Sequence, residues 1–459
     1  MNQVSALGRG DRLPRMLGPV PGPRSRHLAR ALARWEAPGI NTVTPAGAAC
    51  SWQAARGANV LDVDGNRYID LTAGFGVAAV GHRHPRVVEA LRRQSQTLIH
   101  GLGDVAAHPL RGKLARRLCR LVPVDDAQIY WAISGADAVE VAIKTALLAT
   151  GRHALLVFEP SYHGTTLGAL AASSRPAFRQ PFAAHLHPHL HRLPHGCETR
   201  ALARALERRD IACAVVEPIV GREGVRVPPA GWLPALAAAC RHTGTLLVAD
   251  EIFTGFGRTG RWFAVDHEGV RPDLLCCGKA LAGGLPIGAV AGRRALISAW
   301  KGPGEARHTA TFVAHPLACA SALASLDSLV RQRLCARAAR LGARLAERLA
   351  DWPRRHDPVL AVRGRGLLWG LEMARPEYAK ALVRRAASRG LLALAGGPTG
   401  TVLQLCPPLV ITQRQLDRAI SILDAILDAG FDAGFDAELD ADPGPDTERG
   451  IDTEMGAPP

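Results

Sequence analysis

The middle of the chain repeats one pattern, in which a short apolar run is followed by a stretch with helical periodicity. The helical stretches include 137–149, 199–208 and 231–242. The apolar runs do not alternate apolar with polar residues, which is typical of strands that are buried on both faces. Strands that alternate with helices indicate a mainly parallel sheet covered by helices on both sides. The runs that we expect to be strands are 128–133, 154–158, 188–193, 213–217, 245–249, 274–277 and 288–291.

A second region flanks this sheet. The pattern turns helical over 316–351, short strands follow around 362–373, and a final helix is expected near 412–428. Together with the segment before residue 75, this region predicts a smaller α+β domain, so the fold class is α/β with a large and a small domain. The parts that we expect are a flexible basic arm (1–24), the small domain (25–75 and 325–430), the large domain (76–324) and an acidic disordered tail (431–459).

Composition limits the classes of partner. The chain has 459 residues, with 56 Lys and Arg against 41 Asp and Glu, and a formal net charge of +15. Such a charge suits nucleic acid or an anionic membrane surface, but no block of basic residues interleaved with aromatics occurs. We therefore predict neither nucleic acid nor a membrane as a partner. A basic, non-catalytic binding protein is the rival interpretation from another class.

Cysteine usage and hydropathy bear on the compartment. The ten cysteines form no C-x-x-C pair, and several lie in apolar runs, as buried thiols do. No apolar stretch is long enough to span a membrane, and the basic N-terminus lacks the apolar core of a signal peptide. These features predict a cytoplasmic protein.

An acid and an amine stand at the ends of two consecutive apolar runs, Asp250 after LLVA and Lys279 after LLCCG. The chain otherwise uses arginine for almost all of its positive charge. Arginine stays charged in proteins, whereas burial lowers the pKa of a lysine enough for its amine to attack a carbonyl carbon. Lys279 is therefore the candidate nucleophile. The only lysines in the sequence are Lys113, Lys144, Lys279, Lys301 and Lys380.

Five of the predicted strands end in residues with useful chemistry. Open α/β sheets bind ligands beyond the carboxyl ends of their strands, so we expect these residues to meet. After the first strand, Ser134 and Asp137 fit a capping box, and the amides of that helix start also suit a phosphate. An aromatic such as Tyr162 fits a core position or a stack on a flat ligand equally well. The five residues are Ser134, Tyr162, Glu217, Asp250 and Lys279.

Two other patterns have a plain structural interpretation. Residues 255–260 match G-x-G-x-x-G, but these glycines follow Asp250 and Glu251 instead of opening a helix, which disfavours a dinucleotide site. Five histidines lie close together, yet no pattern of Asp, Glu or Cys completes a metal site. We expect them on a surface or edge strand and predict no metal. They are His185, His187, His189, His191 and His195.

Six segments occur in the order and spacing of one known family. They are SGADAVEVAIKTA, SYHGTTLGA, VVEPIVGREG, LLVADEIFTGFGRTG, LLCCGKALAGGLPIGA and HTATFVAHPLACA. Over about residues 25–428 the chain resembles the class III pyridoxal-phosphate-dependent aminotransferases, which include 4-aminobutyrate, ornithine and acetylornithine aminotransferases. The resemblance implies pyridoxal 5'-phosphate (PLP) as cofactor, PLP fold type I, and a homodimer with active sites at the interface.

The resemblance implies transfer of an amino group between an amine or amino-acid donor and a keto-acid or aldehyde acceptor. A PLP-dependent racemase, epimerase or aminomutase on the same scaffold is the alternative. Lys279 matches the lysine that forms a Schiff base and shuttles a proton. Asp250 matches the carboxylate that pairs with the pyridine nitrogen of the cofactor. Tyr162 and Ile252 match the residues on the two faces of the ring.

Other matched positions concern the phosphate and the substrate. The amides of Gly135 and Ala136 are expected to hold the phosphate, and Thr311 to reach the phosphate of the neighbouring subunit. Glu217 matches a glutamate that lies near the substrate and the cofactor.

The chain departs from the family at three positions. Ala136 stands where many members have Ser, and Phe253 where some have Gln near the ring. Gln404, the second predicted substrate-binding residue beside Glu217, stands where 4-aminobutyrate-type enzymes have an arginine for the substrate α-carboxylate. Either the donor or acceptor differs, with Glu217 available to a substrate ammonium group, or another arginine replaces the missing one.

Overall fold

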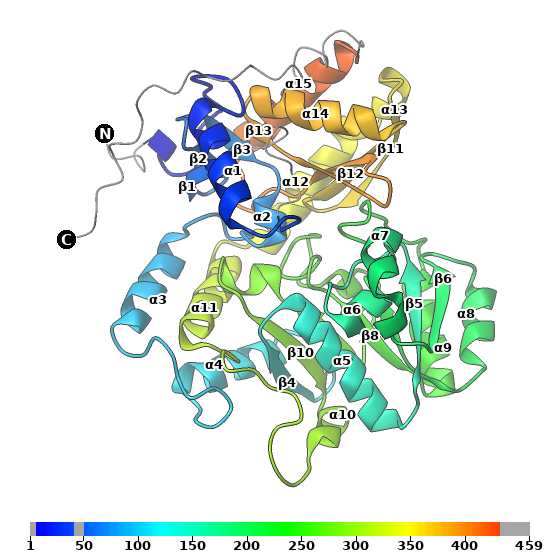
Figure 1. Ribbon diagram of the computed structural model, residues 1–459. Coiled ribbons are helices and arrows are strands. Elements are labelled where there is room, and N and C mark those ends of the chain that lie inside the picture. Colours follow the sequence, from blue (N-terminus) through cyan, green and yellow to red (C-terminus); the bar gives the residue numbers. More distant parts are fainter. Residues whose placement is uncertain (1–5, 41–49, 432–459) are drawn as a thin grey trace.

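The computed structural model describes residues 6–40 and 50–431. Residues 1–5 of the predicted arm and residues 432–459 of the predicted acidic tail lie outside the described residues. Figure 1 shows the described chain as two groups of elements, a larger one around a seven-stranded sheet and a smaller one packed on it.

The larger group is built on a sheet with the strand order β4-β10-β9-β8-β7-β5-β6. Neighbouring strands are parallel except that β10 is antiparallel to both β4 and β9. The mainly parallel seven-stranded sheet that we predict is therefore confirmed. Its strands are β4 (Ala127–Ala132), β5 (Ala154–Glu159), β6 (Leu190–Pro194), β7 (Ile211–Val216), β8 (Leu246–Asp250), β9 (Leu274–Cys277) and β10 (Gly288–Arg293).

Apolar side chains leave both faces of this sheet. In β7, for example, Val215 belongs to one hydrophobic core and Val216 to the other. Successive side chains of a strand point to opposite faces, so a strand of only apolar residues needs cover on both sides. Helix α5 covers one face, and α9 lies in the core of the other face. The helices of the larger group are α3 (Pro85–Ser95), α4 (Pro109–Cys119), α5 (Gly135–Thr150), α6 (Leu167–Ala172), α7 (Pro176–Arg179), α8 (Thr199–Leu206), α9 (Trp232–Thr243), α10 (Arg294–Ile297) and α11 (Pro316–Arg331), with the 3-10 helices η2 (Gln180–His185), η3 (Ala264–His267), η4 (Lys279–Ala282) and η5 (Ser298–Trp300).

The smaller group contains two four-stranded sheets, in the orders β1-β2-β3-β13 and β11-β12-β15-β14. All pairs are antiparallel except β3 with β13. The short strands that we predict around 362–373 form the hairpin β11–β12. The strands are β1 (Trp52–Arg56), β2 (Asn59–Asp62), β3 (Arg67–Asp70), β11 (Val359–Arg365), β12 (Leu368–Met373), β13 (Leu391–Leu392), β14 (Leu394–Gly396) and β15 (Val402–Leu405), and the helices are α1 (Pro23–Trp35), α2 (Ala73–Gly76), α12 (Leu334–Leu349), α13 (Trp352–Arg355), α14 (Pro376–Ser388) and α15 (Gln413–Asp428).

The helical region predicted over 316–351 consists mainly of two helices, α11 and α12. Arg333 between them has a φ of 49°, a left-handed conformation that interrupts a right-handed helix. The chain turns there. Helix α11 packs on α3 and α4, whereas α12 packs on β11.

The described part of the N-terminal arm is attached to the smaller group, whereas we expected a loose segment. Leu7 is fully buried, and the backbone of Arg15 pairs with that of Arg67 in β3. Gln415 in α15 donates to the carbonyl oxygens of Gly10 and Arg12 at 3.2 and 3.1 Å. Glycines and arginines made this segment look mobile, but its backbone groups find partners on β3 and α15.

Candidate active site

Side chains at the carboxyl ends of β4, β5, β7, β8 and β9 surround a cavity of about 220 Å³. All five strand-end residues that we expect to meet lie on its wall. Two predicted site residues, Thr311 and Gln404, do not. The predicted site residues on the wall are Gly135, Ala136, Tyr162, Glu217, Asp250, Ile252 and Lys279.

The start of α5 forms one end of the cavity. Ser134 caps the helix, because its Oγ accepts the N–H of Asp137 at 3.1 Å. The carboxylate of Asp137 accepts the N–H of Ile133 at 2.9 Å and contacts His308 at 2.8 Å. It is therefore not available to the N–H of Ser134, and only half of the predicted capping box forms.

The start of α5 packs closely against the loop after β5, at Gly164, and the loop after β8, at Ile252. A Cβ at Gly164 would lie 2.4 Å from the Cβ of Ala136, and one at Gly135 would lie 3.0 Å from Cγ2 of Ile252. The first N–H groups of a helix have no partner inside the helix. At Gly135 and Ala136 these groups, with the positive end of the helix dipole, suit an anionic group such as a phosphate.

Asp250 forms a buried pair with His163. Its Oδ2 lies 2.6 Å from Nδ1 of His163, and its Oδ1 accepts the N–H of Ile252 at 3.0 Å. Burial acts to lower the pKa of His163, but the hydrogen bond to Asp250 and the charges of Asp250 and Glu217 raise it overall. The carboxylate of Asp250 is thus held in one orientation at the cavity wall, with His163 as its basic partner.

Lys279 begins η4, one residue after the end of β9, with a φ of 35°. Burial lowers the pKa of its amine, although the charges of Asp250 and Glu217 oppose this shift. Its Nζ lies 4.4 Å from the ring centroid of Phe253. A lysine with a lowered pKa has a larger neutral fraction, which is the form that attacks a carbonyl carbon.

Glu217 is 5% exposed and is held by the backbone. Its Oε1 accepts the N–H of Tyr162 and its Oε2 accepts the N–H of Gly221, both at 2.8 Å. Burial raises the pKa of Glu217, against the opposing charge of His163. The protonation state of this carboxyl therefore responds to the charge of whatever occupies the cavity.

Gln404 lies in β15, behind the cavity wall. Its Nε2 donates to the carbonyl oxygens of Gly221 and Arg222 at 3.0 and 2.8 Å. The amide nitrogen of Gln404 thus holds the loop that carries Gly221 and Arg222, and the side chain is not part of the cavity wall.

Thr311 is exposed and does not lie on the cavity wall of its own chain. This position leaves open the expected contact with a neighbouring subunit.

Two charged or titratable residues on the wall, His163 and Arg222, received no role from the sequence. His163 pairs with Asp250, and the guanidinium carbon of Arg222 lies 4.3 Å from the ring centroid of Tyr162. His163 follows Tyr162 at the end of β5, and Arg222 lies between Gly221 and Glu223 after β7. In both cases the available signal was the same, a charged or titratable residue close behind a buried strand.

The glycine-rich stretch 255–260 packs closely against helix α12. Cβ atoms at Gly257 and Gly260 would lie 3.1 and 3.0 Å from atoms of Cys335 and Ala339 in α12. Arg258 is 1% exposed and donates to the carbonyl oxygens of Leu367, at 3.1 Å, and Pro407. The stretch contains no helix, which agrees with our interpretation that it is not a dinucleotide site.

The five clustered histidines lie around the edge strand β6, as we expect. In the described part of the chain none of them belongs to a group of three or more potential metal ligands. His195 instead contacts the carbonyl oxygen of Glu217 at 3.0 Å, and burial lowers its pKa to about 4.

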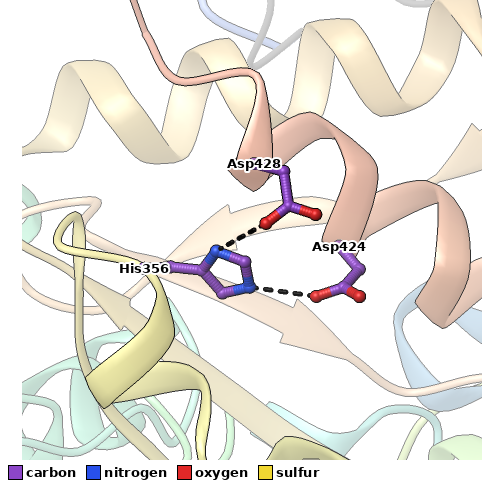
Figure 2. Close-up of side chains that lie close together, drawn as sticks. All are labelled: His356, Asp424 and Asp428. Atoms are coloured by element: carbon purple, nitrogen blue, oxygen red, sulfur yellow. Dashed lines mark hydrogen bonds and ion pairs between the residues drawn. The ribbon is translucent and has the colours of Figure 1, made fainter.

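A separate acidic cluster lies in the smaller group. Figure 2 shows His356 between Asp424 and Asp428 of α15, with ring nitrogens 2.9 and 3.5 Å from the two carboxylates. Arg355 pairs with the same carboxylates at 3.2 and 4.0 Å. Both imidazole nitrogens and a guanidinium already face the two acids, so the cluster ties the end of α13 to α15 as an ion-pair network.

Comparison with known proteins identifies relatives over most of the chain. The aminotransferase class-III family matches residues 43–427. An acetylornithine aminotransferase of Methanopyrus kandleri is 40% identical over 367 residues, 80% of this chain and 91% of the relative. A putrescine aminotransferase of Pectobacterium atrosepticum is 36% identical over 387 residues, 81% of each chain. An ornithine aminotransferase structure from Toxoplasma gondii, with PLP partially occupying its active site, matches with a TM-score of 0.81 at 31% identity over 88% of this chain and 94% of that one.

A search of the described helices found none with the length and apolar character needed to cross a membrane.

Proposed function

We propose that Lys279 is the catalytic lysine of amino-group transfer in this chain, which belongs to the class III PLP-dependent aminotransferases. The fold is PLP fold type I, and the reaction class is transamination. The observation that carries the residue assignment is that Lys279, the one lysine of the sequence that is not exposed, has a lowered pKa and shares a cavity with the buried Asp250.

The residues on the cavity wall fit PLP. A helix start with glycine-permitted close packing suits the phosphate, and Tyr162 and Ile252 supply an aromatic and an aliphatic wall for a flat ring. Asp250, oriented by His163, is a buried acceptor suited to a protonated ring nitrogen. PLP supplies an aldehyde that reacts with amines and a ring that accepts electrons from the substrate carbon.

The protein side of the reaction is proton transfer at Lys279. Its amine would move a proton between the substrate carbon and the cofactor carbon. This role requires an amine that gains and loses protons near neutral pH. The charges of Asp250 and Glu217 limit how far burial lowers the pKa of Lys279. The opposing effects keep the amine responsive to charge in the cavity.

The donor that we propose carries a terminal primary amine, and the acceptor is a keto acid. Acetylornithine, putrescine and ornithine, which name the relatives, share such an amine. Gln404 brings no positive charge to the place where the family arginine binds an α-carboxylate, so the donor's reacting carbon need not bear one.

The test is a comparison of Lys279→Ala with Lys380→Ala, whose side chain is exposed on α14. Purified wild type with PLP should lose its visible cofactor absorbance when mixed with its amine donor and regain it with a keto acid. Lys279→Ala should slow both half-reactions by roughly 10³-fold or more, and Lys380→Ala should behave as wild type. Turnover by Lys279→Ala close to wild type would refute the assignment. Product formation without any keto-acid acceptor would favour a racemase or mutase.

We further propose that the enzyme is a cytoplasmic homodimer whose active sites combine residues of both subunits. The exposed position of Thr311, away from its own cavity, supports a contact with a partner's site. All ten cysteines are free thiols, which suits a reducing compartment.

A further inference from the structure

Arg222 is a cation on the cavity wall for which the structure shows no anionic partner. Its guanidinium carbon lies 4.3 Å from the ring centroid of Tyr162 and 5.3 Å from that of Phe178. Within the described residues the side chain makes no ion pair and donates no hydrogen bond. Two aromatic faces therefore hold the flat guanidinium, while its N–H donors remain available to a ligand.

The loop that carries Arg222 is fixed from several sides. Gln404 donates to the carbonyl oxygens of Gly221 and Arg222, and Glu217 accepts the N–H of Gly221. The next residue, Glu223, is fully buried and pairs with Arg175 at 2.9 Å. The acid is thus paired away from the cavity, and its neighbouring arginine is left on the cavity wall.

Arg222 also lies close to the reacting amine. Phe253 lies between Lys279 and the loop that carries Arg222, because Nζ of Lys279 lies 4.4 Å from its ring centroid and a Cβ at Gly221, the residue before Arg222, would lie 2.8 Å from its Cγ. The charge of Arg222 contributes to lowering the pKa of Lys279, after the larger effect of burial. A substrate that places its reacting carbon at Lys279 therefore has a guanidinium within the same cavity.

We propose that Arg222 binds the carboxylate of the keto-acid acceptor and of the amino acid formed from it, and that Gln404 positions Arg222 by holding its backbone. The inference rests on the proposed function. A guanidinium offers a carboxylate two parallel N–H donors and a full charge, which the amide of Gln404 does not. The terminal-amine donor needs no such contact. Arg222 would therefore recognise the acceptor but not the donor, although both substrates bind in one cavity.

The experiment compares Arg222→Ala and Arg222→Lys with Arg226→Ala, an exposed arginine of the same segment. Two half-reactions of each PLP-loaded enzyme are measured, with putrescine as a donor without a carboxylate and with glutamate as a dicarboxylic amino acid. Binding of glutarate, which cannot react, is measured in parallel by titration calorimetry. Retained cofactor absorbance and circular dichroism show that each variant is folded.

For Arg222→Ala we expect the KM for glutamate and the Kd for glutarate to rise about 10- to 100-fold, with kcat on putrescine changed less than about threefold. Arg222→Lys should fall between this variant and wild type, because it keeps the charge and loses the fork of donors. Gln404→Ala should weaken glutarate binding by a smaller factor, and Arg226→Ala should leave all values unchanged.

Unchanged glutarate binding in Arg222→Ala, or an equal loss of both half-reactions, would overturn the proposal. Wild type that fails to bind glutarate would do the same. Failure of the proposed function has a different signature, since wild type would then show no half-reaction with any donor or acceptor.

Discussion

Asp250 and Glu251 are neighbours in the chain but serve different parts of the molecule. Asp250 lies on the cavity wall, whereas Glu251 is fully buried in the loop that follows β8. The carboxylate of Glu251 accepts the N–H of Val265 at 2.9 Å and the hydroxyl of Thr254. Burial raises the pKa of Glu251 to about 7. Two adjacent acids thus differ because one meets a ligand site and the other stabilises a turn.

The raised pKa of Glu251 predicts a pH-dependent stability. The folded state binds this proton more tightly than the unfolded chain, where a glutamate has a pKa of about 4.3, so the free energy of unfolding falls as pH rises from about 4 through 7. Glu251→Gln removes this loss. We expect its free energy of unfolding, relative to wild type, to increase by about 2 kcal/mol between pH 5 and 8.

Urea unfolding at a series of pH values measures this difference. Glu347→Gln, at an exposed position of α12, is the control and should show no comparable trend. A constant difference between Glu251→Gln and wild type at every pH would contradict the assigned shift.

At the scale of single residues, chemistry that is rare in the sequence was predictable and contacts were not. Lys279 stood out because lysine is scarce and because it follows an apolar run. His163 and Arg222 also follow apolar runs, but histidine and arginine are common in this chain, and their roles depend on Asp250 and Tyr162, which approach them only when β5, β7 and β8 lie side by side. Gln404 was recognised as unusual, but the backbone that it contacts could not be read from spacing.

At the scale of elements, continuous apolar runs predicted the strands of the large sheet because burial on both faces leaves that pattern. The antiparallel placement of β10 was not predictable, because it depends on chain connections and not on the composition of the strand. The ending of α11 was also missed. A left-handed Arg333 has no signal in a helical period that continues through it.

The close contact between the loop after β5 and the start of α5 predicts an effect on cofactor binding. Gly164 has a φ of 133°, and an added Cβ would lie 2.4 Å from the Cβ of Ala136. Gly164→Ala must displace the helix start whose amides we assign to the phosphate. We expect at least about tenfold weaker binding of PLP, since a tenfold change needs only about 1.4 kcal/mol and a forced left-handed residue costs 1–3 kcal/mol.

Equilibrium dialysis of the PLP-free protein measures this affinity. Gly112→Ala in α4 is the matched control, because its added Cβ would meet nothing within 4 Å. Unaltered PLP affinity in Gly164→Ala would argue against the assignment of the phosphate to the start of α5.

At the scale of the whole molecule, the arrangement in Figure 1 supports the division into domains that we propose. The predicted boundary at residue 324 falls inside α11, which packs on α3 and α4 of the larger group. We therefore propose to place the boundary at the turn between α11 and α12. Sequence patterns locate two regions of different character, but only the packing of α11 on α3 and α4 shows to which region this helix belongs.

The proposed homodimer makes a prediction that only mixed subunits can test. If Thr311 serves the partner's cavity, a hybrid of one Lys279→Ala subunit and one Thr311→Asp subunit has one doubly damaged site and one intact site. Each variant alone should be inactive. Lys279→Ala lacks the catalytic amine, and the acid in Thr311→Asp repels the phosphate. Statistical mixing of subunits makes half of the dimers hybrids, so co-expression should restore roughly a quarter of wild-type activity. If Thr311 acted within its own subunit, both sites of the hybrid would be damaged and the mixture would stay inactive.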